Sequence, residues 1–286
     1  MYRDAAARLG SDHEARRIIE EAASSPWPQC LDEPATARAL PYAEAMVDRR
    51  VAGEPLQYVL GRWAFRRLDL LVDRRVLIPR PETEQVVEVA LAELSRLGAQ
   101  VRPPGRGPGI VPGRVMVDLG TGSGAIALSL AAETDHGTVW ATDASPDALA
   151  VARANLAGLG GRAATRVRLA EGGWWDALPG DLRGAVSLAV SNPPYVPTPA
   201  MATLPAEVRW EPAAALDGGP DGLAAFRTIL SEAHDWLAWP GLVVLEIGDG
   251  QAEEVEGLAR AAGFDRVAVH PDLAGRPRAL VAVNGA

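Results

Sequence analysis

The chain has 286 residues and a formal net charge of −9, with 48% hydrophobic and 23% charged residues. This composition is typical of one large globular domain with a smaller one, or of two modest domains. It excludes a helix that crosses a bilayer, because no apolar run approaches the roughly 20 residues required. The negative net charge also argues against a nucleic acid partner, because proteins that bind nucleic acids usually present a basic surface.

Cysteine and histidine usage limits the chemistry further. The only cysteine, Cys30, excludes an internal disulfide and is typical of a reducing compartment. The sequence opens on Met1-Tyr2-Arg3-Asp4 and continues with alanines and charges, without an apolar signal core. We therefore expect a cytoplasmic protein away from membranes. We also expect it to act as a monomer, although none of these features bears on that expectation. No metal is expected, because the four histidines lack ligand spacing: His13, His136, His234 and His270.

Residues 1–60 have a helical pattern and contain no chemical motif. Ser11 and Asp12 can cap a helix whose apolar face includes Ile18 and Ile19. A second helical pattern covers about 34–52, where Pro41 must break or begin a helix. This part of the chain is predicted to be a small helical domain that recognises the substrate.

Residues 61–80 are expected to connect this domain to the rest of the chain. Apolar residues partly alternate over 63–78, with Asp73-Arg74-Arg75 as a possible turn, which predicts a β-hairpin. The next helix is expected to begin at Pro81, which suits a first helical position. Residues 100–113 are rich in proline and glycine and predict an irregular surface loop.

From Val115 onward, strand and helix patterns alternate, which predicts for 81–286 an α/β domain with a doubly wound, mainly parallel sheet. The last two strands have only a short connection, so the final strand is expected to be antiparallel. Strands are expected near 115–119, 138–142, 165–169, 186–191, 241–247, 266–270 and 278–283, and helices near 123–133, 146–158, 221–238 and 250–262.

A glycine turn follows the strand that begins at Val115. It has the sequence Gly120-Thr121-Gly122-Ser123-Gly124, and Asp143 ends the next strand, where an acid can hold ribose hydroxyls. A relaxed dinucleotide pattern also fits this turn, as does a plain turn without a ligand. The G-x-G-x-G repeat resembles the first motif of S-adenosylmethionine-dependent methyltransferases. Asp118 supports that alternative, because a carboxylate there can reach a cationic amino-acid group directly or through water.

A second motif, Asn192-Pro193-Pro194-Tyr195, follows the apolar strand over 186–191. The prolines make a stiff turn, in which the Asn192 side chain and the Pro193 carbonyl can accept both hydrogens of a planar –NH2 group. The ring of Tyr195 can pack against such a group. The alternative is a loop stopped by prolines with a buried tyrosine.

Taken together, the motifs resemble the peptide chain release factor N5-glutamine methyltransferases, also called the HemK family. The resemblance runs from about residue 45 to the C-terminus, whereas only the helical character matches before it. The motifs that carry it, besides the glycine turn and Asn192 to Tyr195, are Gly53-Glu54-Pro55-Leu56-Gln57-Tyr58, Gly61, Leu77-Ile78-Pro79-Arg80-Pro81-Glu82-Thr83-Glu84, Glu211-Pro212, Ala215-Leu216 and Leu245-Glu246-Ile247-Gly248.

The resemblance implies a seven-stranded, Rossmann-like methyltransferase domain with a small N-terminal helical domain and a hairpin connector. It also implies methylation of the glutamine side-chain amide (N5) in the Gly-Gly-Gln motif of class 1 release factors, which act in translation termination. S-adenosylmethionine would be the methyl donor and S-adenosylhomocysteine the product.

The resemblance also implies roles for individual residues. Asn192, Pro193, Pro194 and Tyr195 would hold the glutamine, and all of these except Pro194 would be catalytic. The family usually has Asp before the adenine-flanking tryptophan, whereas this chain has Gly173 before Trp174, and Trp175 is the alternative. The implied cofactor contacts are Gly120, Thr121, Gly122, Ser123, Gly124, Asp143, Trp174 and Asn192.

Other functions are compatible with parts of this pattern. They are glutamine methylation of a ribosomal protein, adenine-N6 methylation of DNA or RNA, and binding of S-adenosylmethionine without catalysis. The acidic charge disfavours the second, and the intact Asn192 and Tyr195 disfavour the third. Arg80 and Glu84 fall near the domain junction, either as supports of the site or as members of an interdomain ion pair.

Overall fold

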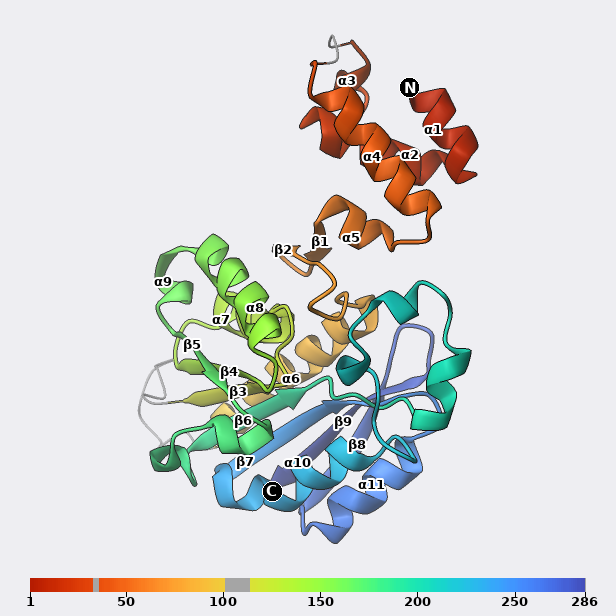
Figure 1. Ribbon diagram of the computed structural model, residues 1–286. Coiled ribbons are helices and arrows are strands. Elements are labelled where there is room, and N and C mark those ends of the chain that lie inside the picture. The colour runs from red at the N-terminus through yellow and green to blue at the C-terminus, as the bar shows by residue number, and fades with distance from the viewer. Residues whose placement is uncertain (33–35, 101–113, 286) are drawn as a thin grey trace.

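The N-terminal helices stand on an α/β body, as Figure 1 shows for the computed structural model, which describes residues 1–32, 36–100 and 114–285. The loop expected over 100–113 lies outside these ranges, apart from its first residue. No helix in the described ranges is both long and apolar enough to span a bilayer.

Five helices form the N-terminal part. Ser11 caps the second of them as expected, because its Oγ accepts a hydrogen bond of 3.2 Å from the Glu14 N–H. Pro41 lies in the first turn of the fourth, where a missing N–H is tolerated. Buried Ile18 and Met46 join their faces in one core. The helices are α1 (Tyr2–Leu9), α2 (Asp12–Ala23), α3 (Gln29–Asp32), α4 (Ala39–Val51) and α5 (Leu56–Leu60).

A hairpin follows, but its turn was expected at the wrong residues. Strands β1 (Arg62–Phe65) and β2 (Leu68–Leu71) pair antiparallel around a turn at Arg66, not around Asp73 to Arg75. Arg66 has a φ of 51°, and its N–H donates to Glu84 Oε1 over 3.0 Å. Asp73 instead makes a separate turn, in which its Oδ1 accepts from the Arg75 N–H over 3.0 Å.

The seven-stranded sheet has the order β5-β4-β3-β6-β7-β9-β8. Pairing is parallel from β5 through β7, whereas β9 is antiparallel to both of its neighbours, which confirms the expected final strand. The strand β7 begins four residues earlier than expected, directly after a helix. The strands are β3 (Val115–Leu119), β4 (Thr138–Asp143), β5 (Val167–Glu171), β6 (Val186–Ser191), β7 (Leu237–Glu246), β8 (Arg266–Pro271) and β9 (Pro277–Asn284).

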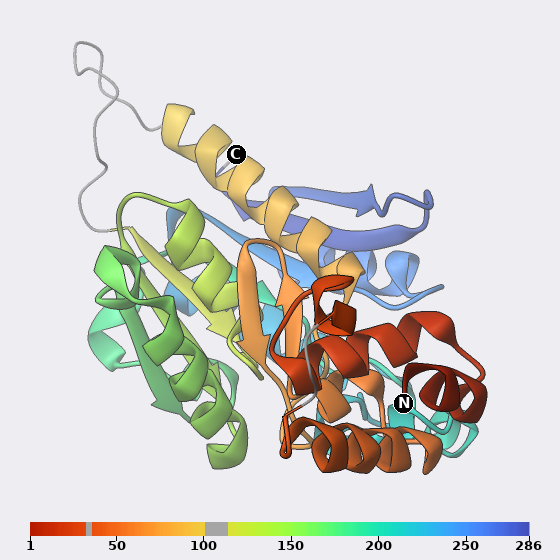
Figure 2. The ribbon, with the colours of Figure 1, turned by 90° about the horizontal axis from the view of Figure 1, so that it is seen from above.

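Helices cover both faces of the sheet, so its central strands are apolar on both sides. Along β3, Met116 packs into the core beneath α6 and α7, and the next residue, Val117, packs into the core beneath α10 and α11. The hairpin contributes Phe65 and Leu70 to the first of these cores. Figure 2 shows the hairpin between α6 and the pair α7 and α8. The helices are α6 (Pro81–Gln100), α7 (Ala125–Glu133), α8 (Pro146–Leu159), α9 (Gly161–Ala164), α10 (Ala224–Trp236) and α11 (Ala252–Ala261).

Short 3-10 helices shape the loops at the carboxyl ends of the strands. Two of them follow β5, and three lie between β6 and α10, where they form a long segment that rises beside the N-terminal helices (Figure 1). They are η1 (Trp174–Ala177), η2 (Gly180–Leu182), η3 (Thr198–Thr203), η4 (Val208–Trp210) and η5 (Ala213–Ala215).

Candidate active site

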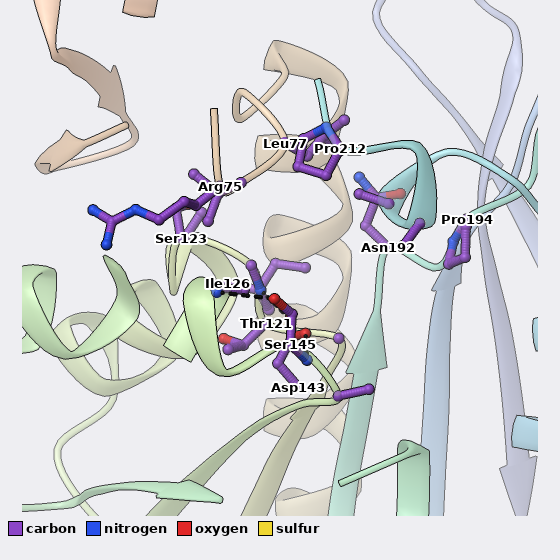
Figure 3. Close-up of a pocket in the computed structure, with 18 of the residues that line it drawn as sticks. Arg75, Leu77, Thr121, Ser123, Ile126, Asp143, Ser145, Asn192, Pro194 and Pro212 are labelled. Carbon is purple, nitrogen blue, oxygen red and sulfur yellow. Dashed lines mark hydrogen bonds between the residues drawn. The ribbon is translucent and has the colours of Figure 1, made fainter. Parts of the chain in front are cut away.

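A cavity of about 380 Å³ opens where the strand order reverses, between β3 and β6. Its walls come from the loops after β3, β4, β5 and β6, from residues 75–79 of the connector and from η5. Figure 3 shows Asp143 and Asn192 projecting toward this space from the ends of two different strands. This position is the common ligand site of open α/β sheets.

The glycine turn after β3 forms the floor of the cavity. Gly120, Gly122 and Gly124 have φ values of 76°, 55° and 87°, a region that other residues rarely adopt. Four residues of the turn line the cavity, whereas Gly124 does not and instead precedes α7. A Cβ on Gly120 would lie 3.5 Å from Trp174 Cζ3, which is an ordinary van der Waals contact, so the turn needs a glycine here for its backbone conformation and not for space beneath the ring.

Asp143 lines the cavity and is held by two backbone groups. Its Oδ1 accepts from the Ser145 N–H and its Oδ2 from the Gly122 N–H, each over 2.9 Å. Burial raises the pKa of this carboxyl, although the two N–H groups counteract that effect. Since each carboxylate oxygen has a second lone pair, Asp143 retains acceptors for a ligand.

Asp118 lies beneath the turn and is completely buried. Its Oδ2 accepts from Thr121 Oγ1 over 2.6 Å and from the Ala127 N–H over 3.0 Å, while Oδ1 has no partner among the described residues. Burial raises the pKa of Asp118 to about 7. Because Asp118 does not line the cavity, it acts on a ligand only through the turn that it supports.

The two adjacent tryptophans have different surroundings. Trp174 lines the cavity together with Gly173. Trp175 is fully buried in the core, where its Nε1 donates to the Ile229 carbonyl over 3.0 Å and its ring stacks on Trp236 at 6.1 Å. Only the first tryptophan can therefore flank a ligand in this cavity.

The residues Asn192 to Tyr195 divide between the cavity and its wall. Asn192 and Pro194 line the cavity, whereas Pro193 is buried and does not. The side chain of Tyr195 turns toward β7, and its hydroxyl donates to Glu246 Oε1 over 3.5 Å. Burial raises the pKa of Tyr195 to about 12, so this phenol is a donor at neutral pH.

Two buried residues linked to Asn192 were not predicted as site residues from the sequence, and one of them, Thr83, lines the cavity. Thr83 accepts from Asn192 Nδ2 over 3.2 Å and donates from the same hydroxyl to Glu246 Oε2 over 2.6 Å. Both residues belong to segments that carry the family resemblance. The sequence also contained a second indication of Glu246, because an acidic residue within the apolar run of β7 requires a buried partner.

Arg80 and Glu84 have separate roles beside the site. Arg80 forms an ion pair with Glu211, whose Oε2 also accepts from the Ile78 N–H over 2.9 Å. This carboxylate joins the connector to the segment between β6 and α10. Glu84 faces the hairpin turn at Arg66 and does not line the cavity. Among the described residues, no group of three or more potential ligands is placed to hold a metal ion.

Known proteins resemble this chain over most of its length. Residues 110–206 match the family model of the methyltransferase small domain. The release factor glutamine methyltransferase of Moorella thermoacetica is 44% identical over 274 residues, which cover 94% of this chain and 90% of that protein. The protein of the same name from Cereibacter sphaeroides is 42% identical over 253 residues, covering 88% of this chain and 82% of its own.

Solved structures show the same fold at lower identity. A methyltransferase from Pyrococcus furiosus has a TM-score of 0.53 at 19% identity, over 87% of this chain and 100% of that one. The N-terminal domain of human METTL16 in complex with SAH has a TM-score of 0.50 at 17% identity, over 77% and 76% of the two chains. The fold is thus that of methyltransferases, and the sequence similarity is more specific: the chain belongs to the release factor glutamine methyltransferase family.

Proposed function

We propose that this protein transfers a methyl group from S-adenosylmethionine to the side-chain amide nitrogen of the glutamine in the Gly-Gly-Gln motif of class 1 peptide chain release factors. One observation carries the proposal: the glycine turn and Asp143 share a single cavity with Asn192, which can bind an amide. The names of its relatives in Moorella thermoacetica and Cereibacter sphaeroides support the same substrate.

The residues of the cavity fit S-adenosylmethionine. The volume of the cavity, about 380 Å³, lies within the usual range for small-molecule sites. The Asp143 carboxylate would hold the ribose hydroxyls, Trp174 would flank the adenine, and Gly120 to Ser123 would line the rest of the molecule. Asn192 also belongs to the proposed cofactor contacts. When bound, S-adenosylmethionine supplies a methyl group that a sulfonium has already activated.

On the substrate side, the chain has to orient a poor nucleophile, because the nitrogen lone pair of an amide is delocalised into its carbonyl. Asn192 Nδ2 donates to Thr83, so the Asn192 Oδ1 is the atom left to accept from the substrate –NH2. The carbonyl of Pro193 is the proposed second acceptor, and Tyr195 and Pro194 would shape the wall behind the amide.

These two acceptors favour the transition state over the ground state. As the new bond forms, the amide nitrogen becomes partly positive and its hydrogens become stronger donors. Oδ1 of Asn192 and the Pro193 carbonyl then bind them more tightly than before, which lowers the barrier. Positioning and electrostatics suffice, and the proton leaves to water after the transfer.

We also propose a division of labour along the chain. Residues 1–60 recognise the release factor, 61–80 connect, and 81–286 carry out methyl transfer. Arg50 supports this arrangement, because its guanidinium contacts Glu14 of α2 over 2.7 Å and Glu207, in the segment beside the cavity, over 2.6 Å. We further propose that the enzyme acts as a cytoplasmic monomer and binds its protein substrate without nucleic acid.

The test is methyl transfer from radiolabelled S-adenosylmethionine to three purified substrates in parallel: a class 1 release factor, ribosomal protein and DNA. We expect label in the release factor alone, located by mass spectrometry at the glutamine amide of the Gly-Gly-Gln motif. A release factor with alanine in place of that glutamine is the matched control and should take up no label. Label in ribosomal protein or DNA, with an unlabelled release factor, would refute the proposal.

A further inference from the structure

Three residues from distant parts of the chain form a continuous hydrogen-bonded path that leads from the wall of the cavity into the core. Thr83 lies in the first turn of α6, Asn192 directly follows β6, and Glu246 ends β7. Thr83 and Glu246 are 4% and 1% exposed, and Thr83 also lines the cavity, whereas Glu246 does not. We call this path, from Asn192 through Thr83 to Glu246, the hydroxyl bridge.

The middle member of the hydroxyl bridge has only one proton to donate. An ionised carboxylate only accepts hydrogen bonds, so Thr83 Oγ1 gives its proton to Glu246 Oε2, which lies 2.6 Å away. Toward Asn192, the same oxygen therefore presents a lone pair. Only the Nδ2 end of the Asn192 amide can satisfy that lone pair, at 3.2 Å, and the Oδ1 end is left for the cavity.

We propose that Thr83 and Glu246 are positioning residues, which fix the Asn192 amide so that its oxygen, not its nitrogen, meets the substrate. The catalytic consequence rests on the proposed function, because an –NH2 substrate needs an acceptor at that point. If Glu246 binds a proton, it can donate to Thr83, whose own proton then turns toward Asn192. The amide would have to rotate, and a donor would face the substrate.

The surroundings of Glu246 bring its protonation, and with it the rotation of the Asn192 amide, close to neutral pH. Burial raises the pKa of Glu246 to about 7, Arg278 of β9 lowers it, and Glu82 of α6 raises it. Thr83 and the Tyr195 hydroxyl, which donate to the carboxylate, also favour its charged form. The acceptor orientation of Asn192 is therefore expected above about pH 7 and should be lost progressively below it.

The orientation can be measured directly, without any substrate, because the chain has only three asparagines: Asn155, Asn192 and Asn284. Asparagine enriched in nitrogen-15 gives three side-chain amide signals by NMR, and the variant Asn192→Ala assigns the one of interest. We expect the Asn192 signal to shift with pH around a midpoint near 7. The Glu246→Gln variant should remove this titration.

The other two asparagines are internal controls. The Asn155 amide donates to the carbonyls of Leu71 and Ser123, and Asn284 Oδ1 accepts from the Gly241 N–H, so their partners do not titrate. Their signals should stay constant over the same range. An Asn192 signal that ignores pH, or that titrates equally in Glu246→Gln, would overturn the proposal.

Activity provides the second arm. In single-turnover methylation of a release factor, Thr83→Val should be slower by at least about tenfold, because the bridge loses its hydroxyl. Thr83→Ser keeps the hydroxyl and should retain most of the rate. Ser129→Ala removes a buried hydroxyl that lies outside the bridge and should change nothing. Cofactor affinity should be little affected in all three variants.

The two arms separate the possible failures. Equal rates for Thr83→Val and Thr83→Ser would overturn the hydroxyl bridge and leave the proposed function standing. A wild-type protein that methylates no release factor would refute the proposed function, whereas the NMR titration would still decide the orientation of Asn192.

Discussion

At the scale of single residues, two buried carboxyls define the chemistry around the cavity. Asp118 supports the glycine turn and Glu246 supports Asn192, and burial raises the pKa of each to about 7. A buried acid of this kind destabilises the fold when it is charged. Both side chains therefore serve the site at the expense of stability near neutral pH.

The pH dependence of stability should reveal this for Glu246. The folded protein holds its proton up to about pH 7, whereas the unfolded chain releases it near its ordinary value of 4.5. Between these values the folded state binds more protons, so the free energy of unfolding falls as pH rises. Over this window the fall is on the order of 3 kcal/mol as an upper limit.

Glu246→Gln should remove that part of the fall while it slows methyl transfer. Urea unfolding of wild type and variant, at about pH 5 and about pH 8, measures the difference. Asp118 titrates in the same range and contributes equally to both proteins, so it cancels in the comparison. A variant whose stability falls with pH as steeply as that of the wild type would contradict the expected titration.

The methylation rates of Asn192 variants should depend on the hydrogen-bond acceptor that each substitution leaves at this position. Asn192→Ala removes the Oδ1 acceptor, and its single-turnover rate should fall by about 10² to 10³. Asn192→Asp keeps an acceptor but places an oxygen against the lone pair of Thr83, so we expect an intermediate rate. Cofactor affinity, measured by calorimetry, should change far less. An alanine variant with near wild-type turnover would remove Asn192 from the mechanism.

At the scale of helices and strands, the hairpin turn is held by Arg66, which forms ion pairs with Glu133 of α7 and Glu88 of α6. Arg66 is 13% exposed and contacts Glu133 of α7 over 2.6 Å through Nε, with a second contact of 2.8 Å through Nη2. Arg66→Ala would leave Glu133 without this partner. We expect a loss of about 2 kcal/mol in the free energy of unfolding, less than for a fully buried pair because water still reaches both groups.

Arg260→Ala is the matched control for Arg66→Ala. Its pair with Glu256 on α11 lies on the surface, with exposures of 61% and 32%, and should contribute no more than about 0.5 kcal/mol. Thermal and urea unfolding of both variants give the comparison. Equal losses would mean that the hairpin is held by its apolar contacts, such as those of Phe65, and not by the ion pairs of Arg66.

The sequence predicted elements better than it predicted their contacts. Short apolar runs that alternate with helical patterns identified all seven strands of the sheet, and the short connection before the last strand identified it as antiparallel. Each of these patterns lies within a few neighbouring residues. The hairpin turn was misplaced, because Asp73 makes a good turn locally and the pairing of Arg66 with Glu133 is not local. The hydrogen bond between Thr83 and Glu246 was not predicted for the same reason, because 163 residues separate the two in the sequence.

At the scale of the whole molecule, the helical part is tied to the rim of the cavity. Arg50 contacts Glu207, and Tyr58 of α5 donates to the Val76 carbonyl over 2.6 Å, next to a wall of the site. The N-terminal helices can therefore orient a bound protein relative to Asn192. The core that α1, α2 and α4 form with α5 is separate from the two cores of the sheet, whereas Tyr58 of α5 also packs with Ala148 and Val151 of α8. The methyltransferase part should therefore keep its packing when only the helices before α5 are removed.

Deleting residues 1–52 should test this role, since Tyr58 stays in place. Calorimetric titration should show that the shortened protein binds S-adenosylmethionine as well as the full chain does. Methylation of an intact release factor should be lost, because the surface that we propose to orient it is absent. Full activity of a soluble shortened protein toward intact release factor would show that residues 1–52 do not select the substrate.

The position of β9 has a consequence for how the protein is made. Strand β9, the last that the structure describes, lies inside the sheet between β7 and β8, and within the described part of the chain β8 pairs with no strand except β9. A nascent chain broken off before Pro277 would thus carry an unattached β8 and an open edge on β7, which invites pairing with other chains. A chain interrupted at that point would expose unpaired strand edges, and we expect chaperones to bind it or proteases to degrade it. The sheet is completed only after residues 277–284 have been synthesised.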